Sequence, residues 1–219
     1  MSCPSTRIEP AVGGSSAING LLYVRGQSQD YDVWRQLGNP GWAFKDVLPY
    51  FKRAEDQERG ADELHGSGGP LGVSDVRMKN ALCEAYIAAC VEAGIPATRD
   101  FNGPSQEGAG YYQLTVRDGR RCSSAVAYLN PARKRHNLRI ITDAEVQSIT
   151  FTGRRANGVR YSAAGADRTV TASREVVLCA GAIGSPQLLE VSGIGSGAAL
   201  KAAGVEVRHE LPGVGEKLQ

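Results

Sequence analysis

The clearest pattern of apolar and polar positions in the chain predicts a helix over residues 80–93. Its apolar positions recur every three or four residues and form one stripe, which comprises Leu82, Ala85, Tyr86, Ala89 and Cys90. Gly94 follows as a stop signal. Cys83 and Cys90 are seven residues apart, so we expect both thiols on one buried face of this helix.

Three shorter stretches before residue 135 also carry helix signals. Asp30 is expected to cap a helix over residues 30–38, and a second helix is expected over residues 44–55. Ser123 is expected to cap a third helix, which Pro131 would end. The polar and glycine-rich stretches between these segments are expected to be loops.

From residue 138 onward the pattern changes to short β-prone runs separated by turn residues. The runs cover residues 138–142, 146–151, 158–162, 169–172 and 175–179. They predict a β-meander that ends in a strongly apolar strand. With the helices before and after it, the meander predicts a mixed α/β (α+β) fold.

The last apolar run leads into a glycine loop and then into helix signals. Ser185 is a good N-cap and Pro186 a good first residue for a helix over residues 187–191, which Gly193 would end. A second short helix is expected over residues 198–203. The nucleotide-like glycines at 193–197 follow a helix rather than a strand, so we interpret them as a helix stop and turn.

Composition and charge exclude several classes of function. Hydrophobic residues make up 42% and charged residues 22% of the chain, as in soluble globular proteins. The net charge is +2, and the basic residues are scattered, which argues against a nucleic-acid surface. No run of about 18 apolar residues occurs, so no membrane span is expected. The first ten residues do not resemble a secretory signal.

The cysteines indicate a reducing environment. There are five, an odd number, and no CxxC pair occurs. A disulfide framework or a zinc site is therefore not expected, and the cytoplasm is the expected compartment. The three histidines are not at metal-ligand spacing, and each is interpreted as structural or solvated. They are His65, His136 and His209.

Residues 13–19 form the first segment that could carry chemistry. Gly13 and Gly14 allow the backbone to come close to a ligand, and the small hydroxyl residues after them can bond to phosphate or to polar ring edges. The alternative is an ordinary turn.

Residues 176–186 form the second such segment. An apolar strand, a glycine loop and a helix N-terminus in this order place backbone N–H groups where an anion can bind. A plain strand–turn–helix corner is the alternative. Hydrolase chemistry is not indicated, because no GxSxG motif is present.

Several longer motifs, taken in chain order, resemble the glucose–methanol–choline (GMC) oxidoreductase family, and in particular its choline dehydrogenase-like and bacterial alcohol dehydrogenase-like members. The resemblance runs from about residue 12 to the end of the chain. The motifs include Gly13-Gly14-Ser15-Ser16-Ala17-Ile18-Asn19-Gly20, Tyr23-Val24-Arg25-Gly26, Asn39-Pro40-Gly41-Trp42, Gly119-Arg120-Arg121-Cys122-Ser123-Ser124-Ala125, Gly181-Ala182-Ile183-Gly184-Ser185-Pro186 and Leu211-Pro212-Gly213-Val214-Gly215.

This resemblance implies that the protein binds FAD and oxidises a small alcohol to a carbonyl by hydride transfer to the flavin. It places Asn19 near the flavin, the backbone of Val146 at the adenine, and the 180–182 turn near the ADP half. The implied cofactor contacts are Gly13, Gly14, Ser15, Ser16, Asn19, Gly20, Val146, Ala180, Gly181 and Ala182.

The sequence also departs from the family pattern. Family members begin with a strand–GxGxxG–helix unit, and a later segment supplies their catalytic histidine. Neither occurs in this sequence, so we assign no catalytic residue and expect an internal fragment with little or no activity.

The expected domains are discontinuous. Residues 1–30 and 135–219 would be pieces of a partial FAD-binding domain, and residues 31–134 a piece of the substrate domain. We expect the isolated chain to be marginally stable or prone to aggregation. The alternative function is a non-catalytic nucleotide-binding or interaction fragment.

Overall fold

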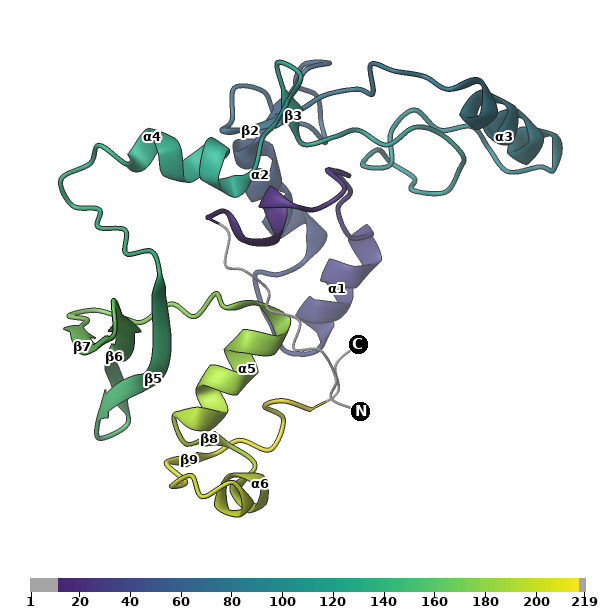
Figure 1. Cartoon of the computed structure of the whole chain (residues 1–219). Coiled ribbons are helices and arrows are strands. Elements are labelled where there is room, and N and C mark those ends of the chain that lie inside the picture. Colours follow the sequence, from purple (N-terminus) through teal and green to yellow (C-terminus); the bar gives the residue numbers. More distant parts are fainter. Residues whose placement is uncertain (1–11, 217–219) are drawn as a thin grey trace, which may run out of the picture. The chain divides into compact units, whose positions relative to one another are not determined.

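The computed structural model describes residues 12–216, which form two compact units. The first unit covers residues 12–138 and the second covers residues 139–216. Figure 1 shows both units. The division of the first unit into an FAD-domain piece and a substrate-domain piece stays a prediction.

Two helices form the apolar centre of the first unit. They are α1 (Ser28–Gln36) and α2 (Phe44–Ala54). Tyr31 is buried, and its ring lies 5.3 Å from Trp34, 6.0 Å from Phe44 and 5.8 Å from Phe51, measured between centroids. The pairs with Trp34 and Phe51 are edge-to-face, and such pairs add to the free energy gained by burying the rings.

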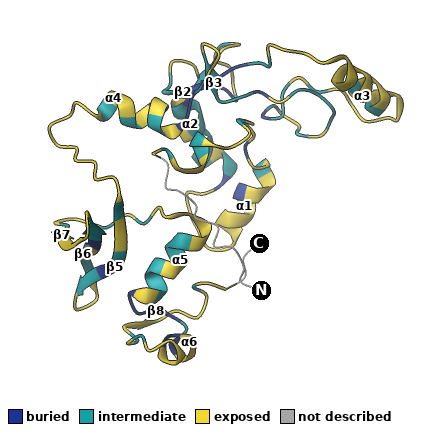
Figure 2. Ribbon diagram, in the orientation of Figure 1, coloured by how far each residue is buried: buried dark blue, intermediate teal, exposed yellow. Residues whose placement is uncertain are grey.

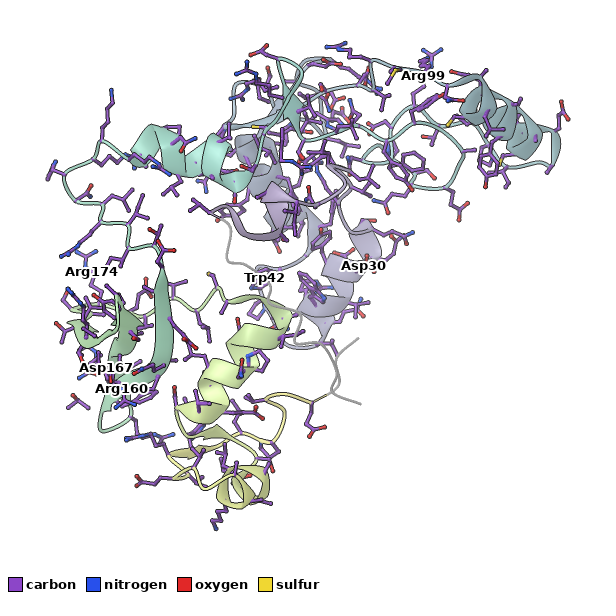
Figure 3. The ribbon with its side chains drawn as sticks, in the orientation of Figure 1. Asp30, Trp42, Arg99, Arg160, Asp167 and Arg174 are labelled. Carbon is purple, nitrogen blue, oxygen red and sulfur yellow. The ribbon has the colours of Figure 1, made fainter. Side chains whose placement is uncertain are left out.

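The expected cap of α1 was wrong by three residues. The helix begins at Ser28, and Gln27 is its N-cap. Asp30, labelled in Figure 3, is the third helical residue, and its carboxylate accepts a hydrogen bond from the Gln27 N–H at 2.8 Å. Sequence alone could not separate these two positions, because an aspartate suits both the N-cap and the third residue of a capping box.

The predicted helix over residues 80–93 is confirmed as α3 (Ala81–Glu92), but its buried face is not. The Asn80 side chain caps it by accepting from the Leu82 N–H at 2.8 Å. No residue of α3 is buried (Figure 2): Leu82 is 78% exposed and Tyr86 68% exposed. Cys83 is exposed and Cys90 half-buried, so the expected buried thiol face is wrong. The apolar stripe predicts an apolar helix face, but it does not predict which part of the protein covers that face.

Short strands connect the helices of the first unit. The parallel pair is β1 (Glu55–Gln57) and β2 (Leu71–Val73), and the antiparallel pair is β3 (Val116–Arg117) and β4 (Arg120–Arg121). Cys122 directly follows β4 and is buried, and its sulfur accepts a hydrogen bond from the Gly72 N–H at 3.3 Å. This contact links the residue after β4 to the middle residue of β2, and so joins the two strand pairs.

The helix expected after Ser123 forms, but Pro131 does not end it. A π-helix (Ala125–Leu129) runs directly into α4 (Asn130–Ala132). The Ser123 hydroxyl accepts from the Val126 N–H at 3.3 Å, as expected of a cap. The wide π turns precede the proline, which cannot donate a backbone hydrogen bond of its own.

The predicted β-meander is confirmed in the second unit. Its strands β5 (Ala144–Thr152), β6 (Arg155–Ala163) and β7 (Ala166–Thr171) form one antiparallel sheet in that order. Residues 138–142 and 175–179, also expected as strands, have no strand structure. They find no partner strand among residues 12–216, and an unpaired segment cannot satisfy the backbone groups of a strand.

Helices α5 (Gly181–Val191) and α6 (Gly197–Ala202) follow the meander, together with the parallel pair β8 (Ile194–Gly195) and β9 (His209–Glu210). The start expected for α5 was wrong, because the helix begins before Ser185. The Ser185 hydroxyl instead accepts from the Ala180 N–H at 3.1 Å, and Pro186 lies inside the helix. Gly193, with φ +87°, follows α5 as expected of a stop residue.

Three expected absences can be examined in the part of the chain that the structure describes. No helix there is long and apolar enough to cross a membrane. No group of three or more His, Cys, Asp or Glu side chains among those residues could hold a metal ion. The cysteines recorded as free are Cys83, Cys90, Cys122 and Cys179, and Cys3 lies outside the described residues.

Candidate functional site

Residues 13–19, called the 13–19 loop from here on, form a tight and largely exposed turn. Its centre is a single 3₁₀ turn, η1 (Gly14–Ala17). Gly13 has φ +105° and Gly14 has φ +57°, values that other residues rarely adopt. A Cβ on Gly13 would lie 3.2 Å from the Cβ of Ala125, whereas Gly14 faces open space. The backbone is thus accessible on one side and closely packed on the other.

Two side chains distant in sequence hold this loop. A single guanidinium nitrogen of Arg121, Nη1, donates to the Ser16 carbonyl at 3.2 Å and to the Asn19 carbonyl and Oδ1, each at 2.8 Å. The Ser124 hydroxyl donates to the Gly13 carbonyl at 2.9 Å, and the Ser124 N–H donates to the Ser16 hydroxyl at 2.9 Å. Sequence reasoning assigned no role to Arg121 or Ser124.

The remaining predicted cofactor residues lie in the second unit and are exposed. Residues 180–182 include Gly181 at φ +85°, with open space around it. Val146 is on β5, beside an irregularity in the pairing with β6 between Val146 and Ser148. The structure therefore brings the first six predicted residues together in the first unit and leaves the other four in the second.

The first unit also contains a buried polar cluster, whose members lie between residues 25 and 113. Its centre is Glu55, the first residue of β1, whose side chain is fully buried. The Glu55 carboxylate accepts from Arg25 Nη2 at 2.8 Å and from the Gly66 N–H at 2.9 Å, and it meets His65 Nδ1 at 3.0 Å. The cluster comprises Arg25, Glu55, Gln57, His65, Asp100 and Gln113.

The charges of this cluster support one another. His65 lies between two carboxylates, with Nε2 at 2.8 Å from Asp100 and Nδ1 beside Glu55. Its hydrogen bonds to Asp100 and then to Glu55 raise the pKa of His65 to about 9, although burial opposes this. Burial alone would raise the pKa of Asp100, but the bond from His65 lowers it below the ordinary value. An ion pair of protonated His65 and ionised Asp100 is therefore the stable form at neutral pH.

The histidines fit their expected structural or solvated roles. His65 is buried in the cluster, whereas His136 and His209 are exposed. From the sequence, Arg25 was expected only as part of a motif and Glu55 only as the last residue of the helix over residues 44–55, whereas Glu55 begins β1. Spacing could not reveal the cluster, because Arg25 lies 30 residues before Glu55 and Asp100 lies 35 residues after His65.

The sequence matches a known protein family over nearly its whole length. Residues 5–219 match the model of the GMC oxidoreductase N-terminal region. The chain belongs to the GMC oxidoreductase family. The resemblance inferred from the sequence motifs is thereby confirmed.

Individual GMC relatives agree with this assignment. The chain is 46% identical over 208 residues to an oxygen-dependent choline dehydrogenase of Brucella anthropi, and 45% identical over 207 residues to the mitochondrial choline dehydrogenase of Homo sapiens. These alignments cover 95% and 94% of the chain. The chain spans 38% and 35% of the length of these two relatives.

Solved GMC structures confirm the fold class. A pyridoxine 4-oxidase from Mesorbium loti superposes with a TM-score of 0.84 at 35% identity, over 91% of this chain and 40% of that protein. An FAD-dependent oxidoreductase from Chaetomium thermophilum gives a TM-score of 0.86 at 30% identity, over 91% of this chain and 37% of the other.

Proposed function

We propose that the chain forms part of an FAD-dependent oxidoreductase that acts on the CH–OH group of a small alcohol, as its choline dehydrogenase relatives do by name. The observation that supports this most directly is the 45–46% identity to choline dehydrogenases across nearly the whole chain. FAD, when bound, would supply the hydride acceptor for oxidation of the alcohol to a carbonyl.

The 13–19 loop fits such a cofactor. Gly14 leaves open space at the backbone, and Ser15 and Asn19 are exposed and can bond to the polar edges of a flavin or to phosphate. In the second unit, residues 180–182 at the start of α5 are exposed, and the N–H groups of the first helical turn would face the ADP half, as the family resemblance implies. These contacts, with Val146 and Gly20, stay proposals. No residue of this chain is assigned to the catalytic step.

The test is flavin retention by the purified chain. The chain is incubated with FAD, separated from free ligand and examined by visible absorption, and choline is then added without oxygen to look for bleaching of the flavin. Retained flavin supports the proposed cofactor site, and bleaching by choline would in addition support the alcohol substrate. A folded chain that retains no flavin contradicts it for this chain.

Two glycine variants test the proposed cofactor site, one in the 13–19 loop and one outside it as the control. Gly13→Ala adds a Cβ to a residue at φ +105° with Ala125 only 3.2 Å away, so it should weaken flavin retention. Gly38→Ala meets a similar φ, +99°, after α1 but has open space and no part in the loop. We expect Gly38→Ala to retain flavin as the unmodified chain does.

The second candidate function is a nucleotide-binding module without redox chemistry. The exposed N-terminus of α5 at residues 180–182 favours it, because a helix N-terminus suits the phosphates of an adenine nucleotide alone. Retention of ADP but not of FAD in the same experiment would support it. A cytoplasmic location stays a prediction that rests on the odd number of cysteines and the lack of CxxC pairs.

A further inference from the structure

We propose that Arg121 and Ser124 are positioning residues for FAD: they hold the 13–19 loop in its binding shape, and Arg121 turns the Asn19 amide so that it presents its NH₂ group to the cofactor. This inference rests on the proposed function. It concerns two residues that touch the loop rather than the cofactor.

The loop needs such support because it has little of its own. Its core is one 3₁₀ turn of four residues without a side-chain cap, and none of those four residues is buried. Two glycines in the left-handed region precede and begin that turn, and glycine loses the most conformational freedom on ordering. A loop held in its bound shape before the ligand arrives binds more tightly, since the ordering cost is not met on binding.

Arg121 also fixes which end of the Asn19 amide faces outward. Asn19 Oδ1 accepts from Arg121 Nη1 at 2.8 Å and from the Leu21 N–H at 3.1 Å. A flipped amide would place its NH₂ against two donors, so the contacts define the orientation. Asn19 is exposed, and its Nδ2 is left to donate to a ligand acceptor. The carbonyl and ring-nitrogen edges of a flavin supply such acceptors.

Ser124 provides the second attachment. It bonds to Gly13 and Ser16 at the start of the loop, while Arg121 bonds to Ser16 and Asn19 toward its end. The two residues come from β4 and the segment after it, about 100 residues along the chain. One short stretch of chain thus contacts both ends of the loop.

The first experiment needs no cofactor. Thermolysin can cut before Ile18, which is 77% exposed, and the rate of this cut is followed by mass spectrometry. Arg121→Gln removes the guanidinium, and Arg120→Gln is the matched control, since Arg120 is its exposed neighbour on β4. Losing charge-assisted bonds should raise the cutting rate of Arg121→Gln roughly tenfold over Arg120→Gln. Ser124→Ala should also raise it, and serves if Arg121→Gln does not fold.

The second experiment measures FAD affinity by quenching of flavin fluorescence. Arg121→Gln should weaken binding roughly tenfold relative to Arg120→Gln. Asn19→Asp keeps both acceptor contacts of Oδ1 but removes the NH₂ donor, so it should weaken FAD binding without faster cutting before Ile18.

Three outcomes overturn the proposal in distinguishable ways. Equal cutting rates in Arg121→Gln, Ser124→Ala and Arg120→Gln show that the two residues do not hold the loop. Equal FAD affinities in Arg121→Gln and Arg120→Gln, with FAD bound by the unmodified chain, remove the positioning role but leave the proposed function standing. No FAD binding by the unmodified chain contradicts the proposed function itself, and the cutting rates then still decide whether the loop is held.

Discussion

At the scale of single residues, Glu55 is the buried negative charge at the centre of the polar cluster. Its side chain is fully buried, and that of its partner Arg25 is 2% exposed. Two charges out of water are tolerated only when both are paired and hydrogen-bonded. Arg25 is paired with Glu55, and its Nη1 donates to the Leu64 carbonyl at 2.7 Å, whereas its buried Nε has no hydrogen-bond partner.

Glu55→Gln should therefore lower the free energy of unfolding by about 3–5 kcal/mol, because it leaves Arg25 buried without a counter-charge. Asp56→Asn is the control on the same strand, since Asp56 pairs with Arg117 where both side chains are more than a third exposed. The control should cost less than about 1 kcal/mol. Urea unfolding measures both, and equal losses would contradict the role given to Glu55.

His65 should make the stability depend on pH on the alkaline side. Its pKa is about 9 in the folded chain against 6.5 ordinarily, so the folded state binds the proton more tightly. The stabilisation is complete below pH 6.5, declines as the pH rises toward 9 and is absent above it. Its size at low pH is on the order of 3 kcal/mol.

The measurement compares the unmodified chain with His65→Gln by urea unfolding from pH 6 to pH 10. The difference in unfolding free energy should be largest near pH 6 and shrink steadily on going to alkaline pH. A difference that does not change with pH would show that His65 contributes through packing alone.

Some of these features of single residues could be predicted from the sequence. Glycines and small hydroxyl residues mark the 13–19 loop because few other residues allow that backbone. Arg121 and Ser124 could not be identified as its supports, because nothing local to residue 121 reports a contact about 100 residues away. The same holds for Arg25 and Glu55.

At the scale of elements, the sequence predicted those structures that depend mainly on residues close together in the chain. The meander formed as expected because alternating strands and tight turns need only sequence neighbours for partners. Residues 175–179 have the composition of a buried strand but no strand structure. Strand formation depends on non-local pairing, which composition does not report.

Ser192 joins two elements of the second unit, and its removal should be costly. The hydroxyl lies just after α5, accepts from the buried Ile149 N–H of β5 at 2.8 Å and donates to the Leu188 carbonyl. Ser192→Ala leaves that N–H without a partner, so we expect a loss of about 1–3 kcal/mol in unfolding free energy.

Ser196→Ala is the matched control for this prediction. Ser196 is the N-cap of α6, but its side chain makes no capping bond. Thermal or urea unfolding should show a change within about 0.5 kcal/mol for Ser196→Ala. If both serine variants lose the same stability, the bond to Ile149 contributes nothing specific.

At the scale of the whole molecule, apolar surface is the dominant feature. Several large apolar side chains of the first unit are more than half exposed. Figure 2 shows exposed residues along much of this unit. They include Leu22, Leu37, Met78, Leu82 and Tyr86. Exposed apolar groups that lie close together favour association.

We therefore expect the purified chain to self-associate with rising concentration in sedimentation velocity and to bind a hydrophobic dye. The double variant Leu82→Glu, Tyr86→Gln should reduce both effects with little loss of stability, because neither side chain is buried in α3. Lys201→Gln on α6 is a control that removes a charge without touching this surface. A concentration-independent monomer that melts cooperatively and reversibly would contradict the expectation.

The contact between Cys122 and Gly72 has a further consequence for experiment. A thiol that is 1% exposed and engaged by a backbone N–H cannot meet an alkylating reagent until the structure around it opens. Cys83, exposed on α3, needs no such opening. In a single labelling time course, Cys83 should therefore react at the intrinsic rate of a thiol. Cys122 should react at a rate that depends on how often β2 and β4 separate. The labelling rate of Cys122, compared with that of Cys83, therefore measures local opening of the first unit.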